Sequence, residues 1–302
     1  MGIIDRANLD RIFTGFKGAY AKGFDGAKSV YPTVAMTVPS TTSEEIYGWL
    51  GQLPRMREWI GDRVIKNLSA HGFTIKNRKF ESTVSVPRER IEDDHYGIFA
   101  PAFEELGKAA AEHPDELIFD LLAKGFTSEC YDGQYFFDTD HPVGSSGGDF
   151  PVTSVANTDG GAGEPWFLLD CSRAIRPLIY QERIPYKLTA LDDDTDEKVF
   201  FRDEYIYGTR ARSNAGFGLW QLAWGSRQTL DAAHYEVGRN AMQKFKGDEG
   251  RLLGVRPTHL VVGPDNEKKA FDLINAATLE NGASNAWKGT VEVIVTPWVH
   301  AA

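Results

Sequence analysis

An alternating pattern over residues 63–94 constrains the fold of this chain more than any other feature. Its apolar positions are Phe73, Ile75, Phe80, Val84 and Val86. Alternation of this kind predicts two long strands, joined near Asn77 and Arg78. At roughly 3.3 Å per residue, a strand of about a dozen residues spans roughly 40 Å, more than the radius of a small domain. We therefore expect residues 63–95 to form a projecting β-hairpin.

Two helices flank this segment. Residues 8–24 place aromatic and aliphatic side chains at helical spacing, which predicts an amphipathic helix. That helix either packs on its own core or forms an arm that docks on a neighbouring subunit, because Gly23 and Gly26 loosen the chain after it. Residues 98–125 give the strongest helical pattern, which Pro114 is expected to kink or divide.

Shorter elements lie between the first helix and the hairpin. Residues 32–39 alternate as a strand. Thr42 and Glu45 form a capping box, which predicts a helix through Leu50. Pro54 predicts the start of a further short helix.

The second half of the chain alternates strands and helices. Strands are predicted at 135–138, 166–169, 175–188, 198–207, 259–262 and 291–295, and helices at 230–245 and from Gly263 onward. The acidic run 192–197 predicts a turn that joins two of these strands as a second hairpin. Residues 259–295 have the order of a βαβ unit. The fold class is therefore α+β.

Composition excludes several classes of protein. The chain has 302 residues, of which 42% are hydrophobic and 25% charged, as in ordinary globular proteins. Its formal net charge of −10 argues against a dedicated nucleic-acid-binding protein. Neither a signal peptide nor an apolar run of about 20 residues is present, so we expect neither export nor membrane insertion. Cys130 and Cys171 belong to no Cys/His cluster, which favours a reducing cytoplasm over a zinc or disulfide scaffold.

Residues 144–148 match the G-x-S-x-G pattern of a hydrolase, with Ser146 as nucleophile and His141 nearby. The nucleophile elbow requires a helix directly after the serine, and Gly148 and Pro151 preclude one. A flexible loop is the favoured interpretation.

Two carboxylate clusters resemble metal sites. Asp138, Asp140 and His141 are plausible ligand types, but Pro142 also explains the run as a turn that ends a strand. The second cluster, formed by Asp192, Asp194 and Asp196, matches the start of a calcium loop, which then lacks its required glycine and glutamate. We therefore expect no catalytic residue, no metal and no cofactor, and not an enzyme.

Basic residues gather between Lys66 and Arg90, close to several acids. This mixed charge suits contacts between copies of one protein. A plain solvated surface and a nucleic-acid contact are the alternatives.

The run 129–142, ECYDGQYFFDTDHP, resembles a sequence block of the Mu-like phage major head subunits. Six further blocks resemble that family: Phe80-Glu81; Ile91 to Asp94 with Gly97; Trp166 to Asp170; Pro177 to Ile179 with Gln181 to Arg183; Trp220 to Ala223; and Pro257 to Val262 with Ala270. Together they extend over nearly the whole chain.

The resemblance implies the Hong Kong 97-type capsid fold. Its parts would be an N-terminal arm at 1–35, peripheral-domain segments at 36–62 and 175–225, an E-loop hairpin at 63–95, a spine helix at 96–126, and axial-domain segments at 127–174 and 226–302. We expect the subunit contacts to include Phe13, Phe16, Tyr20, Phe73, Ile75, Lys76, Arg78, Lys79, Phe80 and Val84.

The function implied by the resemblance is that of a major capsid protein in the virion. Hexamers and pentamers would assemble in the host cytoplasm and enclose double-stranded DNA without sequence-specific binding. Portal, scaffold and decoration proteins are the implied partners. The alternatives are another phage structural protein, such as a tail tube subunit, and a serine hydrolase that uses Ser146.

Overall fold

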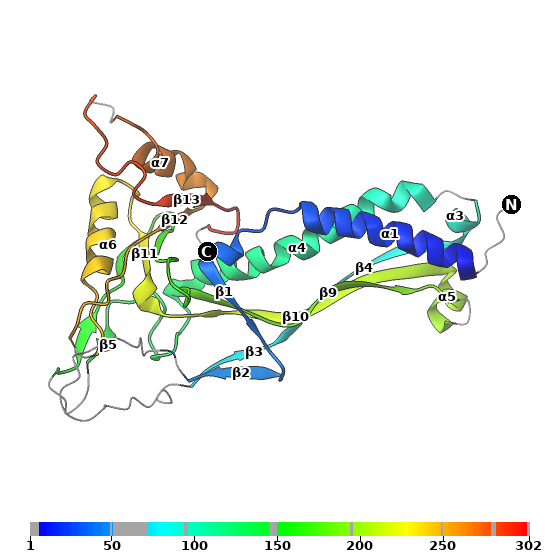
Figure 1. Cartoon of the computed structure of the whole chain (residues 1–302), viewed down its shortest axis with the longest axis horizontal. Helices are drawn as coiled ribbons and strands as arrows, with labels where there is room; N and C mark the ends of the chain where they lie inside the picture. The colour runs from blue at the N-terminus through cyan, green and yellow to red at the C-terminus, as the bar shows by residue number, and fades with distance from the viewer. Residues whose placement is uncertain are drawn as a thin grey trace.

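The structure, a computed structural model, describes residues 6–48, 50, 72–93, 96–144, 150–193, 196–248, 250–278 and 282–300. The chain is elongated and has two lobes (Figure 1). The long lobe is built on a four-stranded sheet and the compact lobe on a five-stranded sheet. None of the helices in these ranges is long and apolar enough to cross a membrane.

The long lobe consists of a sheet with two helices over one face. Its strand order is β1 (Ala35–Pro39), β9 (Leu178–Leu191), β10 (Glu204–Phe217), β4 (Arg78–Pro87). The helices are α1 (Arg6–Gly26) and α4 (Ala100–Ala123), which run side by side along the sheet (Figure 1). β1 is parallel to β9, and the other pairs are antiparallel. Both predicted helices and the second predicted hairpin are confirmed, and Pro114 does not divide α4.

Alternation along β10 determines which face the helices cover. Tyr205 and Tyr207 are fully buried, and they belong to one core cluster with Phe16 of α1 and Phe103 of α4. The rings of Phe16 and Phe103 stack with their centroids 4.1 Å apart. Burial of large aromatic side chains from three elements therefore holds the lobe together.

Two glycines set the distance between α1 and α4. A Cβ atom at Gly23 would lie 1.8 Å from the carbonyl oxygen of Glu104, and one at Gly107 would lie 2.0 Å from that of Tyr20. Only glycine permits this approach of backbones. Of the two alternatives for the first helix, packing on its own core is therefore what the structure shows.

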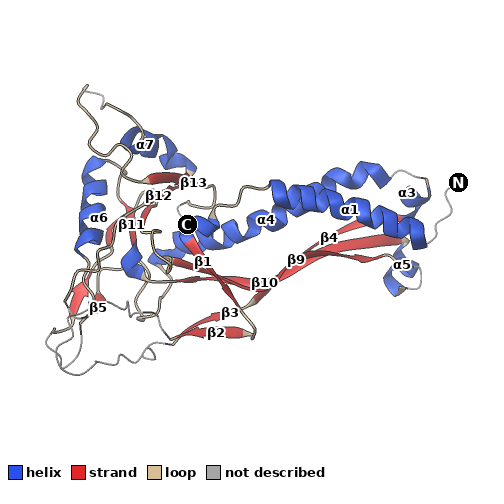
Figure 2. Cartoon of the chain, viewed as in Figure 1, coloured by secondary structure: helices blue, strands red, loops and turns tan. Residues whose placement is uncertain are grey.

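The compact lobe has the strand order β13 (Glu292–Val295), β12 (His259–Val262), β8 (Trp166–Leu169), β11 (Ala223–Arg227), β7 (Thr158–Gly161). All four residues of the central strand β8 are buried. The helices α6 (Ala232–Lys244) and α7 (Pro264–Ile274) lie at the periphery of this lobe (Figure 2). β12, α7 and β13 form the predicted βαβ unit, since β12 and β13 are parallel.

The remaining elements of the described residues are short. They are α2 (Tyr31–Val34), β2 (Glu44–Tyr47), β3 (Phe73–Lys76), α3 (Arg88–Glu92), η1 (Tyr96–Phe99), η2 (Lys124–Phe126), β5 (His141–Val143), β6 (Thr153–Val155), α5 (Glu197–Arg202) and η3 (Trp220–Leu222).

The predicted pairing of the hairpin at 63–94 is wrong. β3 pairs with β2, whereas β4 pairs along its whole length with β10. Asn77 therefore joins two different sheets and is not the tip of a hairpin. The reason is that β10 gives β4 a complete row of backbone hydrogen bonds and a face covered by helices, which a two-stranded ribbon in water lacks.

Three smaller predictions also fail. Glu45 does bond to the Thr41 and Thr42 backbone amides, at 2.9 and 3.3 Å, but these bonds shape a loop before strand β2 and cap no helix. The strand expected from residue 198 begins as helix α5, which Val199 anchors in the core. The strand expected at 135–138 is absent there, and β5 follows it instead. Trp49 and Pro54 lie outside the described residues.

Candidate functional site

The run 129–142 forms a tight turn followed by β5. The Cys130 backbone amide donates to the Gln134 carbonyl oxygen over 2.8 Å, and Gly133 between them has φ +85°, a value that favours glycine. The Asp132 carboxylate accepts from the Gln134 amide over 3.1 Å, as in an Asx turn. The turn therefore points Cys130 and Asp132 toward β5.

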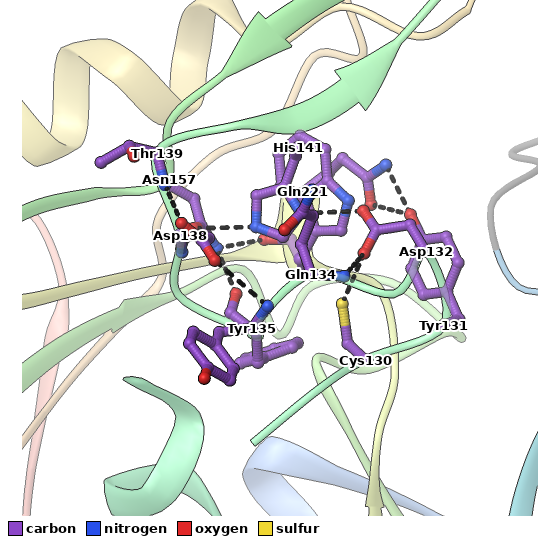
Figure 3. Close-up of polar contacts among 12 residues, drawn as sticks. Cys130, Tyr131, Asp132, Gln134, Tyr135, Asp138, Thr139, His141, Asn157 and Gln221 are labelled. Atoms are coloured by element: carbon purple, nitrogen blue, oxygen red, sulfur yellow. Dashed lines mark hydrogen bonds and ion pairs between the residues drawn. The ribbon is translucent and has the colours of Figure 1, made fainter. Parts of the chain in front are cut away.

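A buried polar network, formed by Cys130, Asp132, His141 and Asn157, fills this region (Figure 3). The Cys130 thiol donates to Asp132 Oδ1 over 3.1 Å, and His141 Nδ1 lies 2.8 Å from Asp132 Oδ2. His141 Nε2 lies 3.2 Å from Asn157 Oδ1. The His141 ring is fully buried and stacks on Trp220 at a centroid distance of 4.1 Å.

Asn157 extends the network into the compact lobe. Its Oδ1 accepts from the Asp138 backbone amide over 2.9 Å, and its Nδ2 donates to the Phe136 carbonyl oxygen over 2.8 Å. Each of these bonds satisfies a polar group that would otherwise be costly to bury. The network therefore joins the 129–142 run to the region before β7.

A cysteine, a histidine and an aspartate are also the components of a nucleophilic site, so their chemistry needs a test. A cysteine nucleophile requires a thiolate close to a histidine base. Here burial, followed by the charge of Asp132, raises the pKa of the Cys130 thiol well above its usual value. His141 Nδ1 faces Asp132, and the cavity of about 520 Å³ beside Phe150 and Phe245 is lined by none of the three residues. The arrangement therefore suits structural stabilisation.

The same three residues could also hold a metal ion, because their ligand atoms lie within 4.8 Å of one another. A cysteine ligand must lose its proton, which the raised pKa of Cys130 opposes. In addition, each donor atom already has a hydrogen-bond partner within the network. The chemistry of these three residues therefore favours a hydrogen-bonded network over a metal site.

Among the described residues, Asp138, Asp140 and His141 do not form a three-ligand cluster, although the Asp138 and Asp140 carboxyl groups interact with each other. The Asp138 carboxylate accepts from the backbone amides of Tyr135 and Thr139, and His141 faces Asp132. Asp192 forms an ion pair with Arg6 over 3.1 Å. Asp194 and Ser146 lie outside the described residues.

The predicted contact residues fall into two groups. Phe16, Tyr20 and Ile75 are buried within their own subunit. Phe13, Phe73, Phe80 and Val84 are partly buried, and Lys76, Arg78 and Lys79 are exposed. Arg78 lies over the Phe80 ring at 5.2 Å.

Two residues around His141 were not predicted to lie there: Asn157, a member of the polar network, and Trp220, whose ring stacks on it. They lie 16 and 79 positions after His141. Trp220 belongs to one of the family blocks, but nothing in that block indicates its contact with His141. Asp132 and His141 both belong to the block 129–142, and their closeness in the sequence was the one indication that they could be in contact.

Comparisons with known proteins identify the family. Residues 9–299 match the family described as Mu-like prophage major head subunit gpT. The major capsid protein of Escherichia phage Mu is 40% identical over 304 residues, which cover 98% of this chain and 100% of the phage protein. The Mu-like prophage FluMu major head subunit of Haemophilus influenzae is 44% identical over 268 residues, 87% of each chain.

Solved structures agree with the sequence relatives. A subunit in the procapsid of bacteriophage JBD30 has a TM-score of 0.87 at 46% identity and covers 98% of this chain and 100% of its own. One from the capsid of the same phage has a TM-score of 0.76 at 35% identity, with coverage of 90% and 91%. The fold is accordingly the Hong Kong 97-type capsid fold, and this chain belongs to the Mu-like prophage major head subunit family.

Proposed function

We propose that this chain is the major capsid protein of a Mu-like phage head, which assembles as hexamers and pentamers into an icosahedral shell around double-stranded DNA. The observation that carries this proposal is the full-length match, in sequence and in fold, to a procapsid subunit. The elongated shape supports it, because a shell of thin subunits needs long lateral contacts (Figure 1). The acidic net charge of −10 fits a wall that encloses DNA without binding its sequence.

We assign the long lobe to the peripheral domain, with α4 as the spine helix, and the compact lobe to the axial domain. We assign the E-loop to the chain between β2 and β3, in place of the predicted range 63–95. These strands pair, with Tyr47 opposite Phe73, so the chain leaves and returns at adjacent positions. β4 instead belongs to the peripheral sheet.

Partners are proposed from the relatives. The JBD30 capsid is described as decorated with minor capsid protein trimers, and a comparable decoration protein is proposed for this shell. We also propose that portal and scaffold proteins are partners of this chain, that the shell assembles in the host cytoplasm, and that the chain has no enzymatic activity.

Electron microscopy of the purified, expressed chain tests the function. Closed icosahedral particles are expected. Open helical stacks of rings would favour a tail tube subunit, and a monomer that reacts with a fluorophosphonate through Ser146 would favour a hydrolase.

A further inference from the structure

Three strands of the long lobe place basic side chains next to one another. Lys79 of β4 lies directly opposite Arg212 of β10, and Lys187 of β9 lies opposite Arg210 of β10. Side chains at opposite positions of an antiparallel pair share a face of the sheet, and so do residues two apart in one strand. These four side chains therefore lie together on a single face, and we call them the basic patch.

The basic patch lies on the face of the sheet that the helices leave open. Along β10, the buried residues Tyr207 and Ala211 alternate with Arg210 and Arg212. Tyr207 belongs to one core cluster with residues of α1 and α4, so these helices cover the opposite face (Figure 1). Both lysines of the patch and Arg210 are exposed, and Arg212 is half-buried. A partner can therefore reach the patch without rearrangement of the subunit.

The charges of the basic patch are not balanced within the described part of the chain. None of its four side chains forms an ion pair with a described residue. Glu81, opposite Arg210, is the one acid in the two cross-strand rows, and its carboxylate accepts from the Thr83 hydroxyl over 2.8 Å. The buried Nε atom of Arg212 has no hydrogen-bond partner in this part of the chain. Because like charges at opposite positions destabilise a sheet, an anionic partner would relieve a repulsion.

A cavity of about 300 Å³ opens within the basic patch. It is lined by residues 79–81 of β4 and 210–212 of β10. One lysine and two arginines therefore surround a space that can receive acidic groups. Arginine binds a carboxylate through two parallel hydrogen bonds, and lysine binds it as a point charge.

The charge distribution of the subunit favours an acidic protein segment over DNA as the partner. The whole chain carries a net charge of −10, so a long, stiff polyanion such as duplex DNA is repelled by the subunit as a whole. A short acidic segment responds mainly to charges within about 8 Å, the Debye length at physiological ionic strength. Neighbouring strands are about 4.8 Å apart, so positive charge prevails over that distance. The acid Glu81 among the cations also suits the mixed charge of a contact between proteins.

We infer that the basic patch is the docking surface for an acidic segment of the decoration protein proposed for this shell. The inference rests on the proposed function and adds to it the face of the subunit and the chemistry of the contact. Carboxylates of the partner bind the four basic side chains, and the open face of the sheet lies on the outside of the shell. A contact of this kind weakens as the ionic strength rises.

Binding of poly-L-glutamate to closed shells tests this inference, because a high-molecular-weight polymer added to the solution reaches only the outer surface. Wild-type shells are expected to bind the polymer, with an affinity that falls as salt is added. K187E/R210E reverses two charges of the patch and is expected to weaken binding at least tenfold. The matched control K246E/K288E reverses two exposed charges of the compact lobe and is expected to bind as wild type does.

The unassembled subunit gives a second measurement, which does not depend on shell closure. The same loss of at least tenfold is expected for K187E/R210E against K246E/K288E, and thermal melting checks that both variants fold. Equal binding of the polymer by the two variants would overturn the inference. Binding by unassembled subunits but not by closed wild-type shells would overturn it too, since the patch would then face another copy or the interior.

Duplex DNA is the comparison ligand. Unassembled subunits that bind DNA through the patch more tightly than poly-L-glutamate would also overturn the inference, because the patch would then suit phosphates. Each of these outcomes leaves the capsid function standing. A wild-type chain that forms no closed shell would contradict the capsid function itself.

Discussion

Asp132 lies between the Cys130 thiol and the His141 ring, and its carboxylate accepts from both. Burial by itself raises the pKa of this carboxyl, but the hydrogen bonds from His141 and Cys130 outweigh burial and hold the pKa below its ordinary value of 3.8. A carboxyl with a lowered pKa in the folded state stabilises the protein above its unfolded-state pKa. That stabilisation disappears as the pH falls through the folded-state pKa.

We predict that Asp132→Asn lowers the free energy of unfolding at pH 7 by about 2 kcal/mol, because it removes a charged partner from buried hydrogen bonds. The difference from wild type should shrink as the pH falls below about 4, because the unfolded chain then takes up a proton at Asp132, and it should vanish once the pH is below the folded-state pKa. Urea unfolding of the unassembled subunit at pH 7 and pH 3 measures both values. Asp265→Asn, on the surface of α7, is the matched control and should change stability little. A difference that is the same at both pH values would contradict the role of the ionised carboxylate.

At the scale of elements, the contact between α1 and α4 depends on two glycines. Gly23 and Gly107 each face a backbone carbonyl oxygen of the opposite helix at a distance that no Cβ atom tolerates. Gly18, on the same helix as Gly23, has no atom within 4 Å of its Cβ position. Intrinsic helix propensity favours alanine at all three positions by about 1 kcal/mol.

We predict that Gly23→Ala and Gly107→Ala destabilise the subunit by about 2 kcal/mol or more, because overpacking outweighs the propensity gain. Gly18→Ala should stabilise it by roughly 0.5–1 kcal/mol. Chemical denaturation measures the free energy of unfolding of the three variants, which should fall for Gly23→Ala and Gly107→Ala and rise for Gly18→Ala. If all three substitutions stabilise, the close packing of the two helices is wrong.

A second prediction concerns the chain between β2 and β3. Because Tyr47 and Phe73 are paired, residues 51–71 can be replaced by a short Gly/Ser linker without separating the strands. We expect a folded subunit that cannot close a shell, if the proposed E-loop assignment is correct and this segment contacts a neighbouring subunit. Circular dichroism tests whether the shortened subunit folds, and electron microscopy tests whether it forms closed shells. Normal particles from the shortened chain would show that the E-loop assignment is wrong.

At the scale of the whole molecule, two lobes with separate sheets form one extended subunit (Figure 2). Such a shape leaves much of the surface of both lobes for contacts with other copies. Shell formation should therefore depend on these surfaces and not on a bound ion or a reactive side chain.

We predict that Ser146→Ala and treatment with a divalent-metal chelator both leave particle formation intact. The reason is that the hydrolase pattern fails on its sequence context, and that Cys130, Asp132 and His141 already bond to one another. Particle yield by electron microscopy, compared with untreated wild type, is the measurement. Loss of particles under either condition would assign a chemical role to that site.

The sequence by itself determined the elements whose signal is local. The helices α1, α4, α6 and α7 follow from apolar positions at helical spacing. Strand patterns on either side of an acidic run predicted β9 and the start of β10, whereas residues 208–217 of β10 were not predicted as strand. The family followed from sequence blocks distributed along the chain, above all residues 129–142.

Only the tertiary structure decided which strands pair and which side chains meet. The alternating pattern of β4 is compatible with pairing to β3 or to β10, because alternation determines which side chains share a face of the strand but not which strand lies beside it. The choice of β10 depends on backbone hydrogen bonds from a strand more than 100 positions away, and on a sheet face that α1 and α4 cover. For the same reason Asn157 and Trp220 could not be placed around His141, since burial in a shared core is a property of the folded chain and not of any local run.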